Sequence, residues 1–299
     1  MRQYSYVFLL TLFTILGCQS SGPQTTERGN TYVKHTNSQT GKAAAPGDYV
    51  YLHAVMRTVD SVLFSTRENS DEPAAIVVPP DSVSGQQVGP VEDVVRNLRA
   101  GDSVTITIRI DTLDFKPPGL ENEDEFYYDI AIKEVVDEAE FKRRREVEQA
   151  EKNAKIRAVQ EREPETMELA TSTLTAYKEG KLDNIQETSS GLKYIIHQEG
   201  TGDQAQAGDI VTVHYIGLLV ADGSNFDQSF NRGEAISFPL GQGRVISGWE
   251  EGLTLLNKGT KASFFIPSDL AYGAAGTPDG SIPPASELMF YVEMEDVRK

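Results

Sequence analysis

The chain has very little of what thiol, disulfide or metal chemistry requires. Its 299 residues include a single cysteine, Cys18, and four histidines. One cysteine allows no intramolecular disulfide, and it excludes cysteine-based metal sites and thiol catalysis within a folded domain. The histidines do not follow the spacing of metal ligands either. The sequence therefore predicts a protein that works without a metal and without a cofactor.

Positive charge is also scarce. The chain has 28 lysines and arginines against 45 aspartates and glutamates, which gives a formal net charge of −17. Binding to nucleic acid or to an anionic lipid surface depends on basic residues, so the sequence predicts neither. The acidic excess is favoured as a source of solubility, and recognition of a partner by the acidic surface is the alternative.

Long apolar runs are missing except at the N-terminus. Residues 7–16 form an apolar run that only two threonines interrupt, and Arg2 is the single charge before it. Such a run is too short to cross a bilayer as a helix and has the length of the apolar part of a signal peptide. It ends in Gly17 and Cys18. This order resembles the bacterial lipobox, in which the cysteine is lipidated and becomes the first mature residue.

The resemblance to a lipobox predicts a lipoprotein signal peptide over residues 1–17 and lipidation of Cys18. We expect an exported bacterial lipoprotein that is attached to a membrane through its lipid anchor. Residues 19–22 contain no acidic cluster, which favours a position facing the periplasm. A plain signal peptide with an incidental cysteine is the alternative.

Composition divides the rest of the chain into four segments. Residues 18–46 are rich in Ser, Thr, Gly, Gln and Asn, so we expect a flexible tether. Residues 47–137 and 190–299 alternate between apolar and polar side chains, as strands do. Residues 138–189 are rich in charge and alanine, and we expect a mostly solvated helical spacer that Pro164 breaks into two helices. A dimerisation helix is the alternative reading of this spacer.

The two β-rich segments resemble each other. Three stretches align in the same order along both of them, with a Gly-Asp pair before the first strand of each. The aligned stretches are 47–53 with 208–214, 100–106 with 258–264, and 128–135 with 290–297. A shared order of this kind predicts two copies of one fold.

The second β-rich segment carries a series of short motifs. They are SGLKY (190–194), EGTG (199–202), VHYIG (213–217), NFDQS (225–229), FPLG (238–241), VISGWEEG (245–252), DLAYG (269–273), IPP (282–284) and LMF (288–290). Together they resemble the FKBP-type peptidyl-prolyl cis–trans isomerases, and this segment is identified as an isomerase domain of that family. The resemblance implies an α+β fold in which a twisted antiparallel sheet forms a half-barrel around one short helix.

The resemblance also implies a pocket, position by position. Tyr272, Asp227 and Ile246 match catalytic positions of the family. The substrate-binding positions are Tyr215, Phe226, Val245, Ile246, Trp249, Tyr272, Ile282, Phe290 and Ile236. In the family, the residue matching Trp249 forms the floor, and the Ile246 N–H and Tyr272 hydroxyl hold carbonyl oxygens of the ligand. Ile236 replaces an aromatic residue and Arg244 replaces Glu or Gln, so one wall and the charge of the rim should differ.

The reaction of this family breaks no covalent bond. Twisting a peptide bond has a barrier of about 18–20 kcal/mol, and X–Pro isomerisation takes roughly tens to hundreds of seconds unaided. A twisted amide has less charge separation than a planar one. A dry aromatic pocket therefore favours the twisted state, and neither a nucleophile nor a metal is required.

The first β-rich segment lacks the pocket residues. In the alignment, Ala54 stands at the position of Tyr215 and Val91 at that of Trp249. We therefore expect residues 47–137 to be a degenerate FKBP-like domain that does not isomerise proline and serves as a scaffold or binds clients.

Three functions are consistent with the sequence. The favoured one is an exported prolyl isomerase that acts on unfolded or proline-containing exported polypeptides, with macrolide-type FKBP inhibitors as further ligands. The second is a chaperone that uses the pocket to hold clients. The third is an anchor that holds a partner at the membrane, with a vestigial isomerase. The complete set of pocket residues favours the first.

Overall fold

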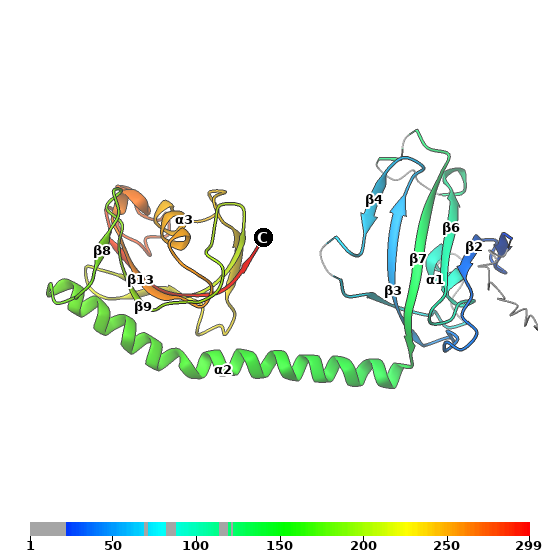
Figure 1. The fold of residues 1–299 in the computed structure, drawn as a ribbon, viewed down its shortest axis with the longest axis horizontal. Coiled ribbons are helices and arrows are strands. Elements are labelled where there is room, and N and C mark those ends of the chain that lie inside the picture. Colours follow the sequence, from blue (N-terminus) through cyan, green and yellow to red (C-terminus); the bar gives the residue numbers. More distant parts are fainter. Residues whose placement is uncertain (1–21, 69–70, 82–87, 114–118, 121) are drawn as a thin grey trace, which may run out of the picture. The chain divides into compact units, whose positions relative to one another are not determined.

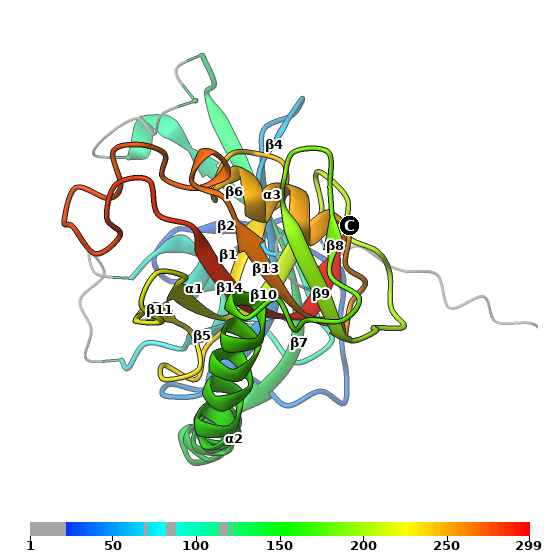
Figure 2. The ribbon, with the colours of Figure 1, turned by 90° about the vertical axis from the view of Figure 1, so that its left-hand side faces the viewer.

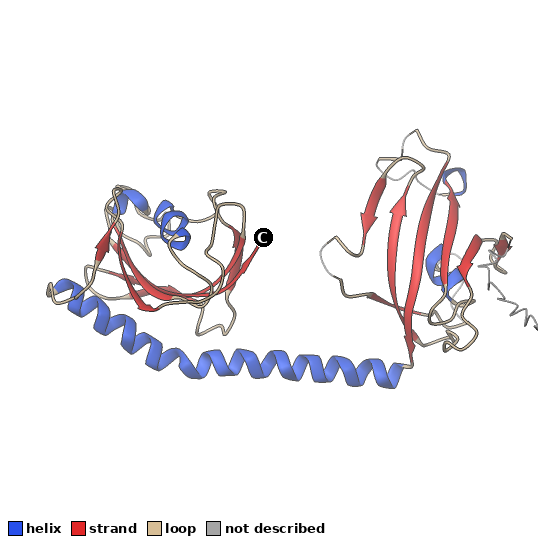
Figure 3. Ribbon diagram, in the orientation of Figure 1, coloured by secondary structure: helices blue, strands red, loops and turns tan. Residues whose placement is uncertain are grey.

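The computed structural model of the protein describes residues 22–68, 71–81, 88–113, 119–120 and 122–299. The chain divides into two compact units, with the boundary between Val147 and Glu148. Each unit is built on an antiparallel sheet (Figure 3). The predicted signal peptide and Cys18 lie outside the described residues. Within the ranges that are described, no helix combines the length and the apolar composition that crossing a membrane requires.

The second unit is a curved sheet with a short helix on its concave side (Figures 1 and 2). Its elements are β8 (Gln186–Glu187), β9 (Lys193–Gln198), β10 (Ile210–Leu219), β11 (Asn225–Gln228), β12 (Ile236–Pro239), α3 (Ser247–Thr254), β13 (Lys261–Ile266), η3 (Ser268–Leu270) and β14 (Leu288–Arg298). The strand order is β11-β10-β14-β13-β9-β8, and β12 also pairs with β10. This arrangement confirms the predicted α+β half-barrel around one helix.

Two glycines let α3 lie close to the sheet. A Cβ atom on Gly252 would lie 2.9 Å from the ring of Phe264, and one on Gly248 would lie 2.4 Å from Ile266. Any larger residue would push the helix outward. The close contact buries Trp249 on the same helix between α3 and the concave face of the sheet.

The other face of this sheet, which we call its outer face, is covered by α2 (Glu138–Lys178) (Figures 1 and 2). The buried residues of this contact are Ala170, Leu174, Ile216, Leu218, Phe230, Phe265, Met289 and Tyr291. Tyr177 stacks on Phe265 with 3.8 Å between ring centroids. Arg162 donates hydrogen bonds to both carboxylate oxygens of the buried Glu293. The helix is therefore held by an apolar stripe and by an ion pair.

The predictions of a break at Pro164 and of a mostly solvated spacer are wrong for this part of α2. A proline inside a helix removes a backbone hydrogen bond and costs about 3 kcal/mol. Burial of Ala170 and Leu174 against the sheet stabilises the turns that follow the proline. The helix bends instead of ending (Figure 1), as proline-containing helices do. From Glu148 onward it belongs to the second unit.

The first unit has the same strand topology. Its elements are β1 (Gln24–Thr25), β2 (Thr31–Thr36), β3 (Tyr49–Arg57), β4 (Val62–Ser65), β5 (Ala74–Val77), α1 (Pro90–Val95), β6 (Ser103–Arg109), η2 (Ile110–Thr112) and β7 (Glu125–Val136). The order β1-β2-β6-β7-β3-β4, with β5 pairing β3, reproduces the second unit strand by strand. The helix α1 stands at the place in the chain order that α3 has in the second unit.

The predicted tether over residues 18–46 is wrong for residues 24–36. The strand β2 pairs with β6 along its whole length, and Tyr32 is a buried residue of the core, only 5% exposed. The composition misleads because Tyr32 and Val33 are the only apolar residues between Gln24 and Thr36. These residues form a regular strand because they pair with β6, and local composition does not reveal that pairing.

The strand registers show which residues of the two units are equivalent. Each long ladder contains one register shift, between Tyr51 and Leu52 in β3–β7 and between Thr212 and Val213 in β10–β14. His53 and His214 are each the second residue after the shift. Each histidine ring then faces a hydroxyl group, that of Thr66 at 3.5 Å and that of Ser229 at 2.8 Å. The equivalence of His53 and His214 is the one that the sequence alignment predicts.

Candidate active site

Nine of the predicted site residues surround one hollow of about 170 Å³ in the second unit. They come from seven parts of the fold: β10 (Tyr215), β11 (Phe226 and Asp227), β12 (Ile236), the segment before α3 (Val245 and Ile246), α3 (Trp249), the loop after η3 (Tyr272) and β14 (Phe290). The curvature of the sheet brings these parts together around the start of α3.

The base of the hollow is an arrangement of aromatic rings around Trp249. The rings of Phe290 and Tyr215 stand edge-on to Trp249, at 5.1 and 5.2 Å between centroids. Phe226 stands edge-on to Phe290 at 5.4 Å. Edge-on pairs of this kind are favourable and leave one face of the enclosed ring open. Gly217 makes the arrangement possible, because a Cβ atom there would lie 2.6 Å from the ring of Phe226.

A hydrogen-bonded group of three side chains closes one side of the hollow. The Tyr215 hydroxyl donates to the Asp227 carboxylate. Arg232 donates to Asp227 Oδ1 at 2.9 Å and to the Tyr215 hydroxyl oxygen at 3.1 Å. Burial, followed by the hydrogen bond to Asp227, raises the pKa of Tyr215 to about 12. The tyrosine is therefore neutral near pH 7, and the carboxylate is held in one orientation by these two donors and by the Gln228 N–H, which donates to Oδ1 at 2.8 Å.

Two hydrogen-bond donors stand at the mouth of the hollow. Ile246 precedes α3 with an extended backbone, and no group in the described part of the chain accepts its N–H. The Tyr272 side chain is 42% exposed, and its hydroxyl has no hydrogen-bond partner among the described residues. Burial of the ring, with the nearby charge of Asp227, raises the pKa of Tyr272, so its hydroxyl keeps its proton.

Two residues, Ile282 and Arg232, differ from the prediction, and Arg244 lies where it was expected. Ile282 does not line the hollow but is buried in the core cluster that also contains Trp249. Arg244, predicted as a change of rim charge, lines the hollow. Arg232 was not predicted, because it lies between two motifs and only folding brings it to Asp227. The only local signal is its position five residues after Asp227 in the chain.

The site is thus an apolar hollow with an aromatic floor and two free hydrogen-bond donors at its mouth, a shape that suits one compact apolar ring. Comparison with known proteins identifies the family. The model of the family "FKBP-type peptidyl-prolyl cis-trans isomerase" matches residues 202–295. The chain is similar to FPR2 of Saccharomyces cerevisiae, a peptidyl-prolyl cis–trans isomerase, with 50% identity over 95 residues, 32% of this chain and 70% of that protein. The chain belongs to the FKBP-type family of isomerases.

Two FkpA proteins are also similar to the chain. FkpA of Aeromonas hydrophila is 48% identical over 119 residues, which are 40% of this chain and 42% of that protein. The crystal structure of FkpA from Escherichia coli is 36% identical, with 56% of this chain and 75% of that chain covered and a TM-score of 0.38. The chain thus spans about two fifths of the length of the first of these relatives, and the family match lies within the second unit.

Proposed function

We propose that the second unit catalyses the cis–trans isomerisation of X–Pro bonds in other polypeptides. The observation that carries this proposal is the floor formed by Trp249, with Tyr215 and Phe290 edge-on to it and a hollow of about 170 Å³ above. A proline ring is the compact apolar side chain whose peptide bond has two accessible isomers.

The hollow would act by holding the twisted amide. With the proline ring on Trp249, the Ile246 N–H and the Tyr272 hydroxyl are the donors free to hold carbonyl oxygens of the peptide. Hydrogen bonds from Tyr215 and Arg232 hold the Asp227 carboxylate in one orientation, so its negative charge has a fixed position at the rim. Water excluded by the rings no longer stabilises the planar, charge-separated amide, so the barrier to rotation falls.

The test is a peptide isomerisation assay with the full chain and a Tyr272→Phe variant. Loss of one hydrogen bond that forms to the substrate is worth about 1 kcal/mol, so we expect kcat/KM to fall about fivefold. Tyr194→Phe is the matched control, because its hydroxyl bonds Gln186 away from the hollow, and it should leave the rate unchanged. A folded wild-type chain that does not accelerate isomerisation would contradict the proposal.

Holding of unfolded clients is a second candidate function, and one feature of the first unit favours it. The hairpin of β3 and β4 exposes Val59, Val62, Leu63 and Phe64. A group of exposed apolar side chains usually marks an interaction surface. Suppression of aggregation of an unfolded client should then weaken in a Val62→Ser, Phe64→Ser variant. Unchanged suppression by that variant would remove this hairpin as the client surface.

We further propose that the protein is an exported bacterial lipoprotein that is anchored through Cys18 and faces the periplasm, and that its clients are unfolded or proline-containing exported polypeptides. The first unit would be a degenerate FKBP-like copy without the isomerase site, and macrolide-type inhibitors would compete with peptides for the second unit. The apolar run before Gly17 and Cys18 supports the anchor. Incorporation of labelled palmitate that persists in Cys18→Ser would refute it.

A further inference from the structure

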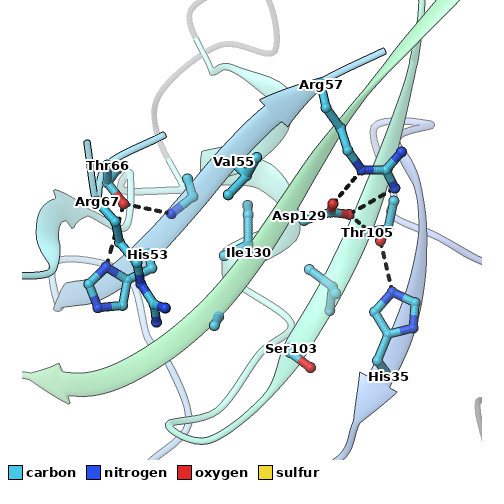
Figure 4. Close-up of a pocket in the computed structure, with 13 residues that line it drawn as sticks. His35, His53, Val55, Arg57, Thr66, Arg67, Ser103, Thr105, Asp129 and Ile130 are labelled. Atoms are coloured by element: carbon cyan, nitrogen blue, oxygen red, sulfur yellow. Dashed lines mark hydrogen bonds and ion pairs between the residues drawn. The ribbon is translucent and has the colours of Figure 1, made fainter. Parts of the chain in front are cut away.

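The outer face of the first sheet carries a hollow of about 490 Å³ that has no part in the prolyl site (Figure 4). Its lining residues are His35, His53, Ala54, Val55, Arg57, Thr66, Arg67, Ser103, Val104, Thr105, Asp129, Ile130 and Ala131. Figure 4 shows two polar ends, one with His53, Thr66 and Arg67 and one with Arg57, Asp129 and His35. Val55 lies between these ends, and with Ala131, which stands opposite His53 on the same face, it forms a small apolar centre.

The same place is filled in the second unit. The residues equivalent to those of the hollow follow from the ladders, in which Val55 pairs with Asp129 and Ile216 with Tyr291. The equivalent pairs are Val55 and Ile216, Arg57 and Leu218, Asp129 and Tyr291, and Arg67 and Phe230. All four residues of the second unit belong to the cluster that packs against Ala170 and Leu174 of α2. This strand array is therefore shaped to accept a helix on its outer face.

In the first unit a helix reaches only one end of that face. Phe141, in the first turn of α2, stacks on Tyr49 with 3.6 Å between ring centroids. Arg144 donates to Glu134 at the end of β7. Neither residue lines the hollow, which begins at His53, two residues further along β3 than Tyr51. The part of the face that corresponds to the α2 contact in the second unit is thus open.

The charged residues of the two outer faces differ. In the second unit the buried acid Glu293 stands opposite His214 and receives Arg162 from α2. In the first unit Ala131 stands opposite His53 instead. The charged residues that line the hollow are two arginines and one aspartate. A helix that is to cover this face therefore needs to bring acidic side chains instead of an arginine.

One of the two arginines is available to such a helix. Arg57 is paired with Asp129, which also accepts a hydrogen bond from Thr105 at 2.6 Å. Arg67 has an exposed side chain that makes no ion pair with any residue of the described ranges. It lies beside His53, which is only 9% exposed. A carboxylate at this end would meet an unpaired guanidinium next to the apolar centre.

We propose that the outer face of the first unit binds an amphipathic helix of a partner polypeptide, with an acidic side chain of that helix paired to Arg67. The apolar stripe of the helix lies over Val55 and Ala131, as the stripe of α2 lies over Ile216 in the second unit. Arg57, held by Asp129, marks the other end of the contact. The partner is thus recognised by an apolar stripe flanked by acids.

The test uses a peptide with residues 159–178 of this chain as the probe. This segment has the apolar stripe that covers the equivalent face of the second unit, and it carries glutamates at 161, 163, 165 and 168. Fluorescein-labelled peptide is titrated with the full chain, with Arg67→Glu and with the control Lys155→Glu, which makes the same charge change on an exposed helical residue outside the hollow. A second peptide has the four glutamates replaced by glutamine.

We expect wild type and Lys155→Glu to bind the acidic peptide equally, and Arg67→Glu and the glutamine peptide each to lower affinity at least tenfold. An unchanged circular dichroism spectrum and an unchanged urea transition of the first unit show that Arg67→Glu is folded. Equal binding by Arg67→Glu, equal binding of the glutamine peptide, or no binding to wild type at millimolar peptide overturns the proposal. Sedimentation that shows a wild-type dimer and a monomeric Arg67→Glu also overturns it, because the occupant would then be a second copy of this chain.

Discussion

Replacement of Gly217 by alanine should inactivate the isomerase without unfolding it. The new Cβ atom would lie 2.6 Å from Cζ of Phe226 and 2.9 Å from Cε1 of Phe290, whereas ordinary contact begins at 3.4 Å. The Phe226 ring must therefore retreat by about 0.8 Å and the Phe290 ring by about 0.5 Å. Overpacking of this size costs about 1–3 kcal/mol of unfolding free energy. A misplacement of about 1 Å in a site lowers its rate about 100-fold.

We expect kcat/KM of Gly217→Ala to fall about 10- to 100-fold in a protease-coupled assay with a proline peptide. Gly223→Ala is the matched control in the turn that follows β10. Its positive φ of 79° strains an alanine, but the nearest neighbour of its Cβ is Cδ2 of Leu174 at 3.8 Å, away from the pocket rings. Both variants should lose stability in urea, and only Gly217→Ala should lose its rate. A folded Gly217→Ala with the wild-type kcat/KM would refute the assigned walls.

Three further predictions concern charge and burial. Arg244 lines the hollow, so we expect kcat/KM to be higher for a peptide with Glu before proline than for one with Lys there. Arg244→Glu should shift the ratio of kcat/KM for these two peptides about tenfold. An unchanged ratio would show that Arg244 does not select the substrate. Burial and the hydrogen bond to Asp227 raise the pKa of Tyr215 to about 12. Folding therefore favours the protonated tyrosine. The free energy of unfolding that this contributes is fully present below about pH 10 and should be lost as the pH rises from about 10 to 12. Urea unfolding of Tyr215→Phe should show a smaller loss over that range, and an equal loss would assign it elsewhere. Arg162→Met should lower the free energy of unfolding by about 1–3 kcal/mol, because Glu293 stays buried with fewer donors; a calorimetric stability equal to that of wild type would contradict this.

The walls of the site could be predicted because each lies in a short motif. Trp249, Ile246 and Val245 are neighbours in one stretch, and Phe226 precedes Asp227 directly. Local order therefore identifies these residues even though the sheet has to curve to bring them together. Ile282 shows the limit of this reasoning, because a position in a motif does not distinguish a lining residue from one that packs behind the lining.

Contacts between distant segments could not be predicted in the same way. Arg162 and Glu293 are 131 positions apart, and no local pattern links a helical arginine to an acid in the last strand. The continuation of α2 through Pro164 depends on the same packing, since the local cost of proline is offset only when the helix lies on the sheet. The pairing of β2 with β6 is likewise a property of the assembled sheet, which the polar composition of residues 24–36 conceals.

The repeated fold explains how the two units can differ on one face and agree in topology. Successive side chains of a strand point to opposite faces of the sheet, so residues of the concave face can change without altering those of the outer face. In β3, Ala54 replaces the wall residue Tyr215 on the concave face, while Arg57 replaces Leu218 on the outer face. The first change removes an aromatic wall, and the second removes an apolar contact for a helix such as α2. The absence of an aromatic wall at Ala54 therefore says nothing about the outer face of the first unit, which carries a hollow with charged residues at both ends.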